Sequence, residues 1–231
     1  ATHCPIGFDV AKLRHRVLET YDRVAREPEG DFHFHRGPGY AAQALGYDPD
    51  ELRSLPARAT ARFAGVGNPI AAGPISAGEV VLDHACGAGM DLLLAARRVG
   101  PHGRAIGVDL TPAMREAATD AAREAGLDTL VEIRGGVFEE LPIAGATIDV
   151  VLSNGVLNLS PDKPQVLREA FRVLLRAAGS TSDELVALCR DAGFVDGRVV
   201  LRHQSFAGTS AEQRLSRDLH VGAVTFFALK P

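Results

Sequence analysis

The stretch from Val80 to Asp91, VVLDHACGAGMD, places an acid and a glycine-rich turn directly after an apolar run. The apolar run ends at Asp83, and Gly87 and Gly89 follow it. A turn of this kind between a strand and a helix is typical of a nucleotide-binding site. A second acid, Asp109, ends the next apolar run, about 20 residues further on, where a carboxylate can accept hydrogen bonds from ribose hydroxyls.

The spacing Asp83-x-x-x-Gly87-x-Gly89 differs from both common phosphate-binding turns. It is neither the G-x-G-x-x-G turn that seats a pyrophosphate on a helix N-terminus nor the G-x-x-x-x-G-K-[ST] loop that binds triphosphates. A carboxylate that points into the turn repels phosphate and attracts a cation. A ligand with a ribose, a positive amino group and no phosphate therefore suits both acids, and S-adenosylmethionine is a cofactor of this kind.

An alternation of strands and helices has to position this turn. Strand-like apolar runs occur at Glu79–Asp83, Ala105–Leu110, Val131–Ile133, Ile148–Leu152, Val199–Arg202 and Ala223–Leu229. Helical patterns occur at Met90–Val99, Pro112–Ala125, Lys163–Leu174 and Thr181–Ala192. This order predicts an α/β fold, a Rossmann-like and mostly parallel sheet with helices on both faces. No helical pattern follows the last run, which favours an antiparallel last strand.

The chain divides near Gly73 into an N-terminal helical lid, residues 1–73, and a second domain, residues 74–231. A chain of 231 residues can bury one sizeable core. The first third is too short to be an independent domain, so we expect it to pack as a lid on the second.

Two helix starts are visible in the lid. Asp9 is placed to cap a helix whose apolar residues recur at helical spacing, and Asp48 precedes a proline at the first position of another helix. Between these helices, residues 31–37 alternate polar and aromatic side chains, which favours an extended segment. A glycine-rich loop, residues 63–69, leads into the second domain.

The composition excludes several classes of function. The net charge of −4 leaves no basic surface for nucleic acid. No apolar run approaches the roughly 20 residues that a membrane span requires, and the first residues lack a signal-peptide pattern. The three cysteines share no metal-ligand spacing, which predicts reduced thiols, a cytoplasmic protein and no metal site. We therefore expect a small-molecule substrate, while the oligomeric state is not encoded in any recognisable pattern.

The stretch around Asp83 resembles motif I of the class I methyltransferases, in which an acid is followed by G-x-G-x-G, matched here by Ala85, Gly87 and Gly89. Further segments resemble the branch that includes the arsenite methyltransferases: Tyr21–Ala25, Phe63–Pro69, Asp91–Gly100 and Ser153–Lys163. The resemblance implies a class I methyltransferase fold with a seven-stranded sheet. It also implies methyl transfer from S-adenosylmethionine, with S-adenosylhomocysteine as product.

The resemblance assigns roles to individual residues. Gly87 and Gly89 let the backbone approach the methionine part of the cofactor, and Asp109 holds the ribose. Met114 packs against the adenine, or alternatively only within its own helix, and Asn154 lies below the sulfonium. The full cofactor-binding set implied is Tyr21, Gly67, Asp83, Ala85, Cys86, Gly87, Gly89, Asp109, Leu110, Met114, Val137, Phe138 and Asn154.

Several positions in or beside this set depart from the family pattern or have a structural alternative. Val137, which with Phe138 flanks the adenine, replaces a usual acid, so a contact with the adenine amino group is in question there. Ala85 replaces a glycine, at little cost if the backbone needs no positive φ. We interpret Cys86 as a packing or backbone contact, not as a nucleophile, and His84 as structural.

The departures also bear on the substrate. Arsenite methyltransferases bind arsenic with several thiolates, because this soft centre prefers sulfur. The corresponding loop after the fourth strand, Ser153–Asn158, contains no cysteine. Leu92 stands at the position after Asp91, where a cysteine can occur in that family. Cys189 matches no arsenic ligand. A small organic acceptor is therefore favoured. An arsenite methyltransferase, and a non-methylating enzyme or binding module on the same fold, remain the alternatives.

Candidate acceptor-side groups lie in the lid and in the loop after the fourth strand. His33 and His35 could share one face of the extended segment and take a proton from the acceptor. The alternative is that they hydrogen-bond the lid to the sheet domain. Arg36, Gly155 and Asn158 are the candidate substrate-binding residues, with helix capping as the alternative for Asn158. Orienting the acceptor can suffice for methyl transfer, so a base is not required.

A strand of the family fold is missing from the sequence. After the helix that ends near Leu174, the family usually has a Pro-Gly-Gly turn and a fifth strand, whereas here Leu175–Thr181 leads directly into the next helical pattern. Losing an interior strand would leave two sheet edges with unpaired backbone groups. The sequence therefore predicts that a segment is absent between about Leu174 and Ser180.

Overall fold

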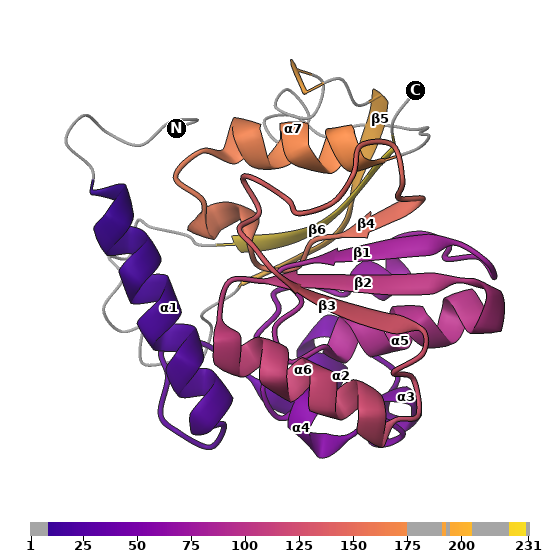
Figure 1. Ribbon diagram of the computed structural model, residues 1–231. Coiled ribbons are helices and arrows are strands. Elements are labelled where there is room, and N and C mark those ends of the chain that lie inside the picture. The colour runs from indigo at the N-terminus through magenta and orange to yellow at the C-terminus, as the bar shows by residue number, and fades with distance from the viewer. Residues whose placement is uncertain (1–8, 175–190, 193–194, 205–221, 230–231) are drawn as a thin grey trace.

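The computed structural model describes residues 9–174, 191–192, 195–204 and 222–229 (Figure 1). At their centre lies a four-stranded sheet of order β3-β2-β1-β4, in which every pairing is parallel. Its strands are β1 (Val80–His84), β2 (Arg104–Asp109), β3 (Val131–Gly135) and β4 (Val150–Leu152). The strand order reverses between β1 and β4. The carboxyl ends of these strands therefore flank a topological switch point, where open α/β sheets bind ligands.

Helices cover both faces of this sheet, as the sequence predicts. α5 (Met90–Val99) and α6 (Pro112–Glu124) lie on one face, and α7 (Lys163–Val173) lies on the other (Figure 1). Consecutive residues of a strand point to opposite faces. Val81 accordingly packs in the core with α5, whereas Leu82 packs in the core with α7. The short strand β1 thus belongs to both cores and is fixed from both sides.

The N-terminal segment is helical, and two of its helix starts are those predicted. Its helices are α1 (Val10–Arg26), α2 (Gly37–Leu45), α3 (Pro49–Arg53) and α4 (Ala57–Thr60), followed by the 3₁₀ turn η1 (Pro69–Ala71). Asp9 caps α1 by accepting the Lys12 N–H at 2.9 Å, and Asp48 caps α3 by accepting the Asp50 N–H at 2.7 Å. The sequence did not predict α2, because glycines and a proline dominate its first turn. Pro38 there occupies an early helical position, which tolerates proline.

The segment between α1 and α2 is irregular, so the expectation of an extended run with two regular faces is wrong. The chain bends at His33 and Phe34. The bend lets Phe34 stack on Tyr21 of α1, with ring centroids 6.1 Å apart, and contact Phe32 at 5.6 Å. Aromatic packing therefore overrides the alternation of polar and apolar side chains.

The N-terminal helices share a core with the sheet. Ala41, Leu45 and Phe63 are buried in the same cluster as Val81 and Leu93.

No helix in the described part of the chain is both long and apolar enough to cross a membrane. Two further 3₁₀ turns, η2 (Gly100–His102) and η3 (Leu157–Leu159), connect the later elements.

Two long strands near the C-terminus form a sheet of their own. β5 (Val195–Gln204) pairs antiparallel with β6 (Gly222–Leu229), with two irregularities in the register. Both strands were expected, and the antiparallel direction of the last strand is confirmed. In the described residues the strands thus form sheets of four and two, not the single seven-stranded sheet that the resemblance implied.

The span in which we predict an absent segment lies outside the described residues. Its first residue, Leu174, makes an isolated parallel bridge with Ile148, just before β4. Residues 175–190 are not described, and they include most of the expected helix Thr181–Ala192. A missing segment between about Leu174 and Ser180 therefore stays a prediction.

The turn after β1 has an unusual backbone. φ is +75° at Ala85, +53° at Gly87 and +90° at Gly89. Glycine adopts these angles readily, whereas a Cβ makes the left-handed region costly. We expected Ala85 to cost little only if the backbone needs no positive φ, and this condition is not met. Ala85 adopts the left-handed conformation that favours glycine.

Replacing Ala85 by glycine should stabilise the protein. Because the strain of a left-handed alanine is relieved, we expect the free energy of unfolding to rise by about 1 kcal/mol. Chemical denaturation of the two proteins measures this difference. Ala88→Gly, in the same turn but absent from the positive-φ residues, is the control and should destabilise or be neutral. If Ala85→Gly destabilises the protein, the backbone at Ala85 is not strained.

Candidate functional site

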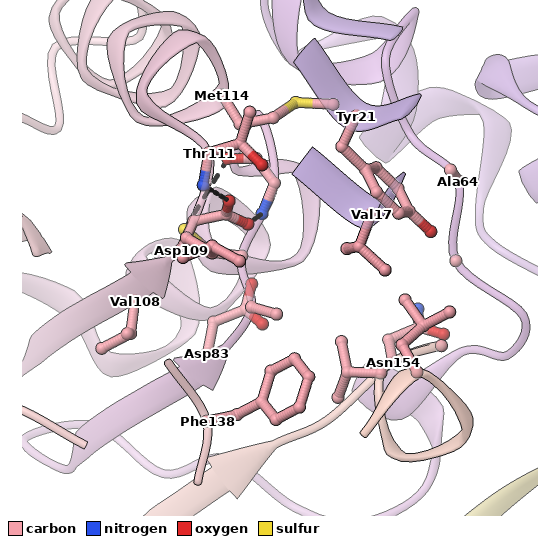
Figure 2. A pocket seen from close by; sticks show the side chains of 18 of the residues that line it. Val17, Tyr21, Ala64, Asp83, Val108, Asp109, Thr111, Met114, Phe138 and Asn154 are labelled. Atoms are coloured by element: carbon pink, nitrogen blue, oxygen red, sulfur yellow. Dashed lines mark hydrogen bonds between the residues drawn. The ribbon is translucent and has the colours of Figure 1, made fainter. Parts of the chain in front are cut away.

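A cavity opens at the carboxyl ends of the central strands (Figure 2). It contains about 1060 Å³ of empty space, part of it continuous with solvent. Its walls come from α1, from residues 59–65, from the turn after β1, and from the loops after β2, β3 and β4. The cavity therefore occupies the switch point of the sheet and draws on both the N-terminal segment and the sheet domain.

Most of the predicted cofactor residues come together in these walls. The predicted residues that line the cavity are Tyr21, Asp83, Ala85, Cys86, Gly87, Asp109, Leu110, Met114, Val137, Phe138, Asn154 and Gly155. The predicted residues that do not line it are His33, His35, Arg36, Gly67, Gly89 and Asn158.

Asp109 ties two loops of the cavity together. One carboxylate oxygen accepts the Gly87 N–H at 2.9 Å, and the other accepts the Thr111 N–H at 2.7 Å. Burial raises the pKa of Asp109, and these two donors oppose that rise. Each carboxylate oxygen can accept more than one hydrogen bond. Asp109 therefore keeps acceptor capacity for two neighbouring hydroxyls, such as those of a ribose.

Three buried aspartates line the cavity. Asp83, Asp91 and Asp109 all line it, and at most 8% of each residue is exposed. None of the three forms an ion pair with another described residue. Buried charges without a counter-charge are costly in proteins. The site is thus built for a ligand that brings positive charge with it.

Apolar side chains line the cavity beside these acids. Met114 is 1% exposed and packs in one cluster with Val24 of α1, while it also faces the cavity. Figure 2 shows Val108 and Phe138 on the same side of the cavity as Asp83. Val137 forms an isolated bridge with Glu140. A flat aromatic group such as adenine fits between such side chains, and Met114 both packs within the fold and lines the site.

Asn154 anchors the glycine-rich loop over the cavity. Its Oδ1 accepts the N–H groups of Val66 at 2.8 Å and Gly67 at 3.0 Å. Its Nδ2 donates to the Gly67 carbonyl and to Asp91, both at 2.9 Å. A Cβ on Gly65 would collide with this amide, so glycine is required there. Gly67 thus contributes to the site through backbone bonds to Asn154, although it does not line the cavity.

α1 closes one side of the cavity. Val17 and Tyr21 project from it toward the space between Asp109 and Asn154 (Figure 2). Burial, followed by the charge of Asp109, raises the pKa of Tyr21 to about 12. A phenol with this pKa stays protonated at neutral pH, so it can donate a hydrogen bond but is unsuited to act as a base.

The proposed lid histidines lie away from the cavity. His33 is exposed and packs edge-on against Phe34 at 4.9 Å, and His35 stacks on Tyr40 at the same distance. Arg36 lies over the ring of Phe32 and donates to the carbonyl of Gly30 at 2.6 Å.

Asn158 is exposed in η3 and caps no helix by any described bond. Asp162 instead caps α7, by accepting the Gln165 N–H at 3.0 Å. The catalytic and acceptor-binding roles of the lid and loop residues therefore stay predictions.

His84 and Cys86 fit the structural roles expected from sequence. Burial lowers the pKa of His84 to about 4, and its Nε2 lies 3.3 Å from the Phe138 carbonyl. Its ring also meets the Phe138 ring edge-on at 5.8 Å. Burial raises the pKa of the Cys86 thiol well above its usual value. A thiol held protonated in this way is a poor nucleophile.

Sequence reasoning missed several lining residues, of which Arg14, Arg62, Asp91 and Glu139 are charged. Arg14, Val17 and Tyr21 recur at spacings of three and four along α1, so the helical face that carries Tyr21 was the available signal. Asp91 stands two residues after Gly89, in the first turn of α5. No sequence signal marks Glu139 in its loop.

The comparisons define the class of this protein. Residues 75–192 match the family model described as a methyltransferase domain, and the chain belongs to this family. It is 42% identical over 133 residues to an arsenite methyltransferase of Halobacterium salinarum, over 58% of this chain and 34% of the relative. It is 34% identical over 100 residues to a demethylmenaquinone methyltransferase of Lactobacillus johnsonii, over 43% of this chain and 41% of the relative. The chain therefore spans about two fifths or less of the length of these relatives.

Solved structures place the fold in the same class. An arsenic (III) S-adenosylmethionine methyltransferase from Chlamydomonas reinhardtii superposes with a TM-score of 0.57 at 27% identity, over 84% of this chain and 72% of that one. The [4+2]-cyclase SpnF superposes with a TM-score of 0.56 at 20% identity, over 84% and 76% of the two chains, which shows a shared fold. The fold is that of the class I S-adenosylmethionine-dependent methyltransferases.

The cavity fits the cofactor of this family. S-adenosylmethionine carries a sulfonium, an amino group, a ribose and an adenine but no phosphate. The unpaired carboxylates match its positive charges, Asp109 matches the ribose hydroxyls, and the wall at Met114 and Phe138 matches the adenine. The residues that would hold the cofactor are therefore present.

Replacing Asp109 by alanine should weaken cofactor binding. The substitution removes the acceptor for ribose hydroxyls and leaves the Gly87 and Thr111 N–H groups unpaired, so we expect a loss of about 1–3 kcal/mol. Isothermal titration calorimetry with S-adenosylmethionine measures it. Asp128→Ala, at an exposed position away from the cavity, is the matched control. Unchanged affinity in Asp109→Ala would remove Asp109 from the binding site.

Proposed function

We propose that this protein transfers a methyl group from S-adenosylmethionine to a small organic molecule. The observation that carries the proposal is the cavity itself. It combines unpaired carboxylates on one side with an acceptor end that contains no thiol among the described residues. Cys86 is the one cysteine in the described part of the chain, and it lies in the turn beneath the cavity with a raised pKa.

The acceptor end is bounded mainly by apolar groups. Side chains that line the cavity away from the turn include Val17, Phe63, Val156, Leu159 and Pro161. When bound, S-adenosylmethionine supplies a methyl group that an acceptor takes by direct displacement, as the carbon–sulfur bond breaks. In this step the chain orients the acceptor and excludes water, which is a large part of catalysis in group transfer.

Arsenite methylation is the second candidate. It is favoured by the 42% identity to the arsenite methyltransferase of Halobacterium salinarum and by the likeness to the Chlamydomonas reinhardtii structure. The described residues contain no group of histidine, cysteine or acidic side chains suited to hold a metal ion. On this reading, free thiols would bind the arsenic and deliver it to the cavity.

A third candidate is a non-methylating role on the same fold, either as a binding module or as an enzyme with other chemistry. Normal affinity for S-adenosylmethionine without formation of S-adenosylhomocysteine would support it. We further propose that residues 1–73 act as the lid of a domain formed by residues 74–231, and that the protein is cytoplasmic.

Turnover assays separate these candidates. We expect S-adenosylhomocysteine to form with a panel of small organic acceptors and not with arsenite, whether or not glutathione is present. Product is measured by liquid chromatography with mass spectrometry. Turnover that depends on arsenite would establish the second candidate instead. Binding without turnover on any acceptor would favour the third.

The lid histidines have a test of their own. If His35 accepts a proton from the acceptor, His35→Ala should bind S-adenosylmethionine normally and turn over more slowly. His15→Ala, at an exposed position on α1, is the control for loss of a histidine. Turnover equal to that of the unsubstituted protein would leave His33 and His35 with structural roles, such as the observed packing of His35 on Tyr40.

A further inference from the structure

Glu139 is a carboxylate at the end of the cavity away from the glycine-rich turn. It follows Phe138 in the loop after β3, lines the cavity, and has only 9% of its side chain exposed. Its Oε1 accepts the Ser160 hydroxyl at 2.8 Å. Leu159 and Pro161, the two neighbours of Ser160, also line the cavity. Glu139 therefore lies beside the apolar groups that bound the end proposed for the methyl acceptor.

The course of α1 supports this position. Tyr21 lines the cavity, and the charge of Asp109 acts on its hydroxyl. Arg14 precedes Tyr21 by about two turns of the helix, which is about 10 Å along the axis. Arg14 forms an ion pair with Glu139 at 3.5 Å. Glu139 therefore lies toward the opposite end of the cavity from the carboxylate that is suited to the ribose.

The contacts of Glu139 hold it in place but leave one carboxylate oxygen open. Ser160 occupies Oε1, and Nε2 of Gln165 donates to the Glu139 backbone carbonyl at 3.1 Å. The guanidinium of Arg14 approaches Oε2 at 3.5 Å, which is longer than a charge-assisted hydrogen bond of about 2.7–2.9 Å. Within the described residues, Oε2 accepts no hydrogen bond. The carboxylate is thus anchored through one oxygen, and the other keeps its acceptor capacity.

An open carboxylate oxygen in such a place restricts which molecules can lie beside it. A ligand that excludes water from this oxygen without donating to it leaves a charged group unpaired, which costs free energy. Nearby lining side chains, such as Val17 and Val156, are apolar and supply no donor. Apolar pockets of this kind gain their specificity from a few placed polar groups. A ligand that fills this end of the cavity therefore has to bring a hydrogen-bond donor for Oε2.

We propose that Glu139 binds the methyl acceptor, and that this acceptor has an apolar body and a hydroxyl or amine hydrogen that it donates to Oε2. The inference rests on the proposed transfer of a methyl group to a small organic molecule, and it names the class of that molecule. The apolar body contacts the surrounding side chains, and the hydrogen bond fixes its orientation. Molecules of the same size that lack a polar hydrogen leave Oε2 unpaired and bind less well for that reason.

Fluorine NMR titrations test this contact without turnover. The protein is saturated with S-adenosylhomocysteine, which carries no transferable methyl group, and is titrated with para-fluorophenol, para-fluoroaniline or para-fluorotoluene. These probes share one ring, and their hydroxyl, amine and methyl groups are similar in size. The phenol and the aniline can donate a hydrogen bond, whereas the toluene cannot. The quantity measured is the dissociation constant of the toluene divided by that of each donor probe, which we call the donor ratio.

Two variants and a control make the test specific. Glu139→Gln keeps the size of the side chain but replaces a charged hydrogen-bond acceptor with a neutral one, so the donor ratio should fall about fivefold for at least one donor probe. Glu140→Gln, at the exposed neighbouring position outside the cavity, is the matched control and should leave both donor ratios unchanged. Arg14→Gln tests whether Arg14 instead donates to the probe. Both donor ratios should persist or rise in Arg14→Gln, because Ser160 still anchors Glu139.

Each outcome decides the proposal. Donor ratios that are the same in Glu139→Gln as in the unsubstituted protein would overturn it, as would donor ratios that fall in Arg14→Gln or donor probes that do not bind. A fall for one donor probe alone supports it and identifies the hydrogen that the methyl acceptor presents. If circular dichroism shows that Glu139→Gln is unfolded, the donor ratios in Arg14→Gln decide.

Failure of this inference is distinguishable from failure of the proposed function. Turnover on organic acceptors together with donor ratios that do not depend on Glu139 would remove the role of Glu139 and leave methyl transfer standing. Donor ratios that depend on Glu139, without turnover on any organic acceptor, would remove the proposed function and leave the contact with Glu139 standing.

Discussion

Burying a carboxylate costs several kcal/mol unless donors or a cation compensate it, and this protein buries three around one cavity. Hydrogen-bond donors offset part of this cost, and Arg115 adds a positive charge near Asp109. The Gly87 and Thr111 N–H groups bind Asp109, and Tyr47 and Asn154 bind Asp91. Asp83 and Asp91 make no ion pair with another described residue, and burial raises the pKa of both. This arrangement is suited to a cationic ligand more than to a phosphate.

The hydrogen bonds of Asn154 explain why the N-terminal segment belongs to the site. Asn154 follows β4, yet its amide is saturated by the backbone of the glycine-rich loop and by Asp91 of α5. Gly65 makes this approach possible by lacking a side chain. One asparagine thereby joins three parts of the chain that are distant in sequence. The packing of Ala41 and Phe63 against the sheet core strengthens the same connection.

The sequence predicted the parts of the fold that depend on local pattern. The apolar run before Asp83, the caps Asp9 and Asp48, and the alternation of strands and helices all have short-range signals, and the structure confirms them. Contacts between distant segments carry no such signal. That is why the engagement of Asn154 by the loop backbone was not foreseen. The positive φ of Ala85 was missed for a related reason, because alanine gives no indication of a left-handed backbone.

The ion pair between Arg14 and Glu139, at 3.5 Å, joins two walls of the cavity, α1 and the loop after β3. The Arg14 side chain is 45% exposed, so dissolved salt screens its attraction to Glu139. The Oε1 atom of Glu139 accepts the Ser160 hydroxyl at 2.8 Å and stays anchored if Arg14 leaves. Added salt therefore weakens the ion pair between Arg14 and Glu139 but not the hydrogen bond between Ser160 and Glu139. Ligand exchange should quicken with added salt, while the interior of the site keeps its geometry.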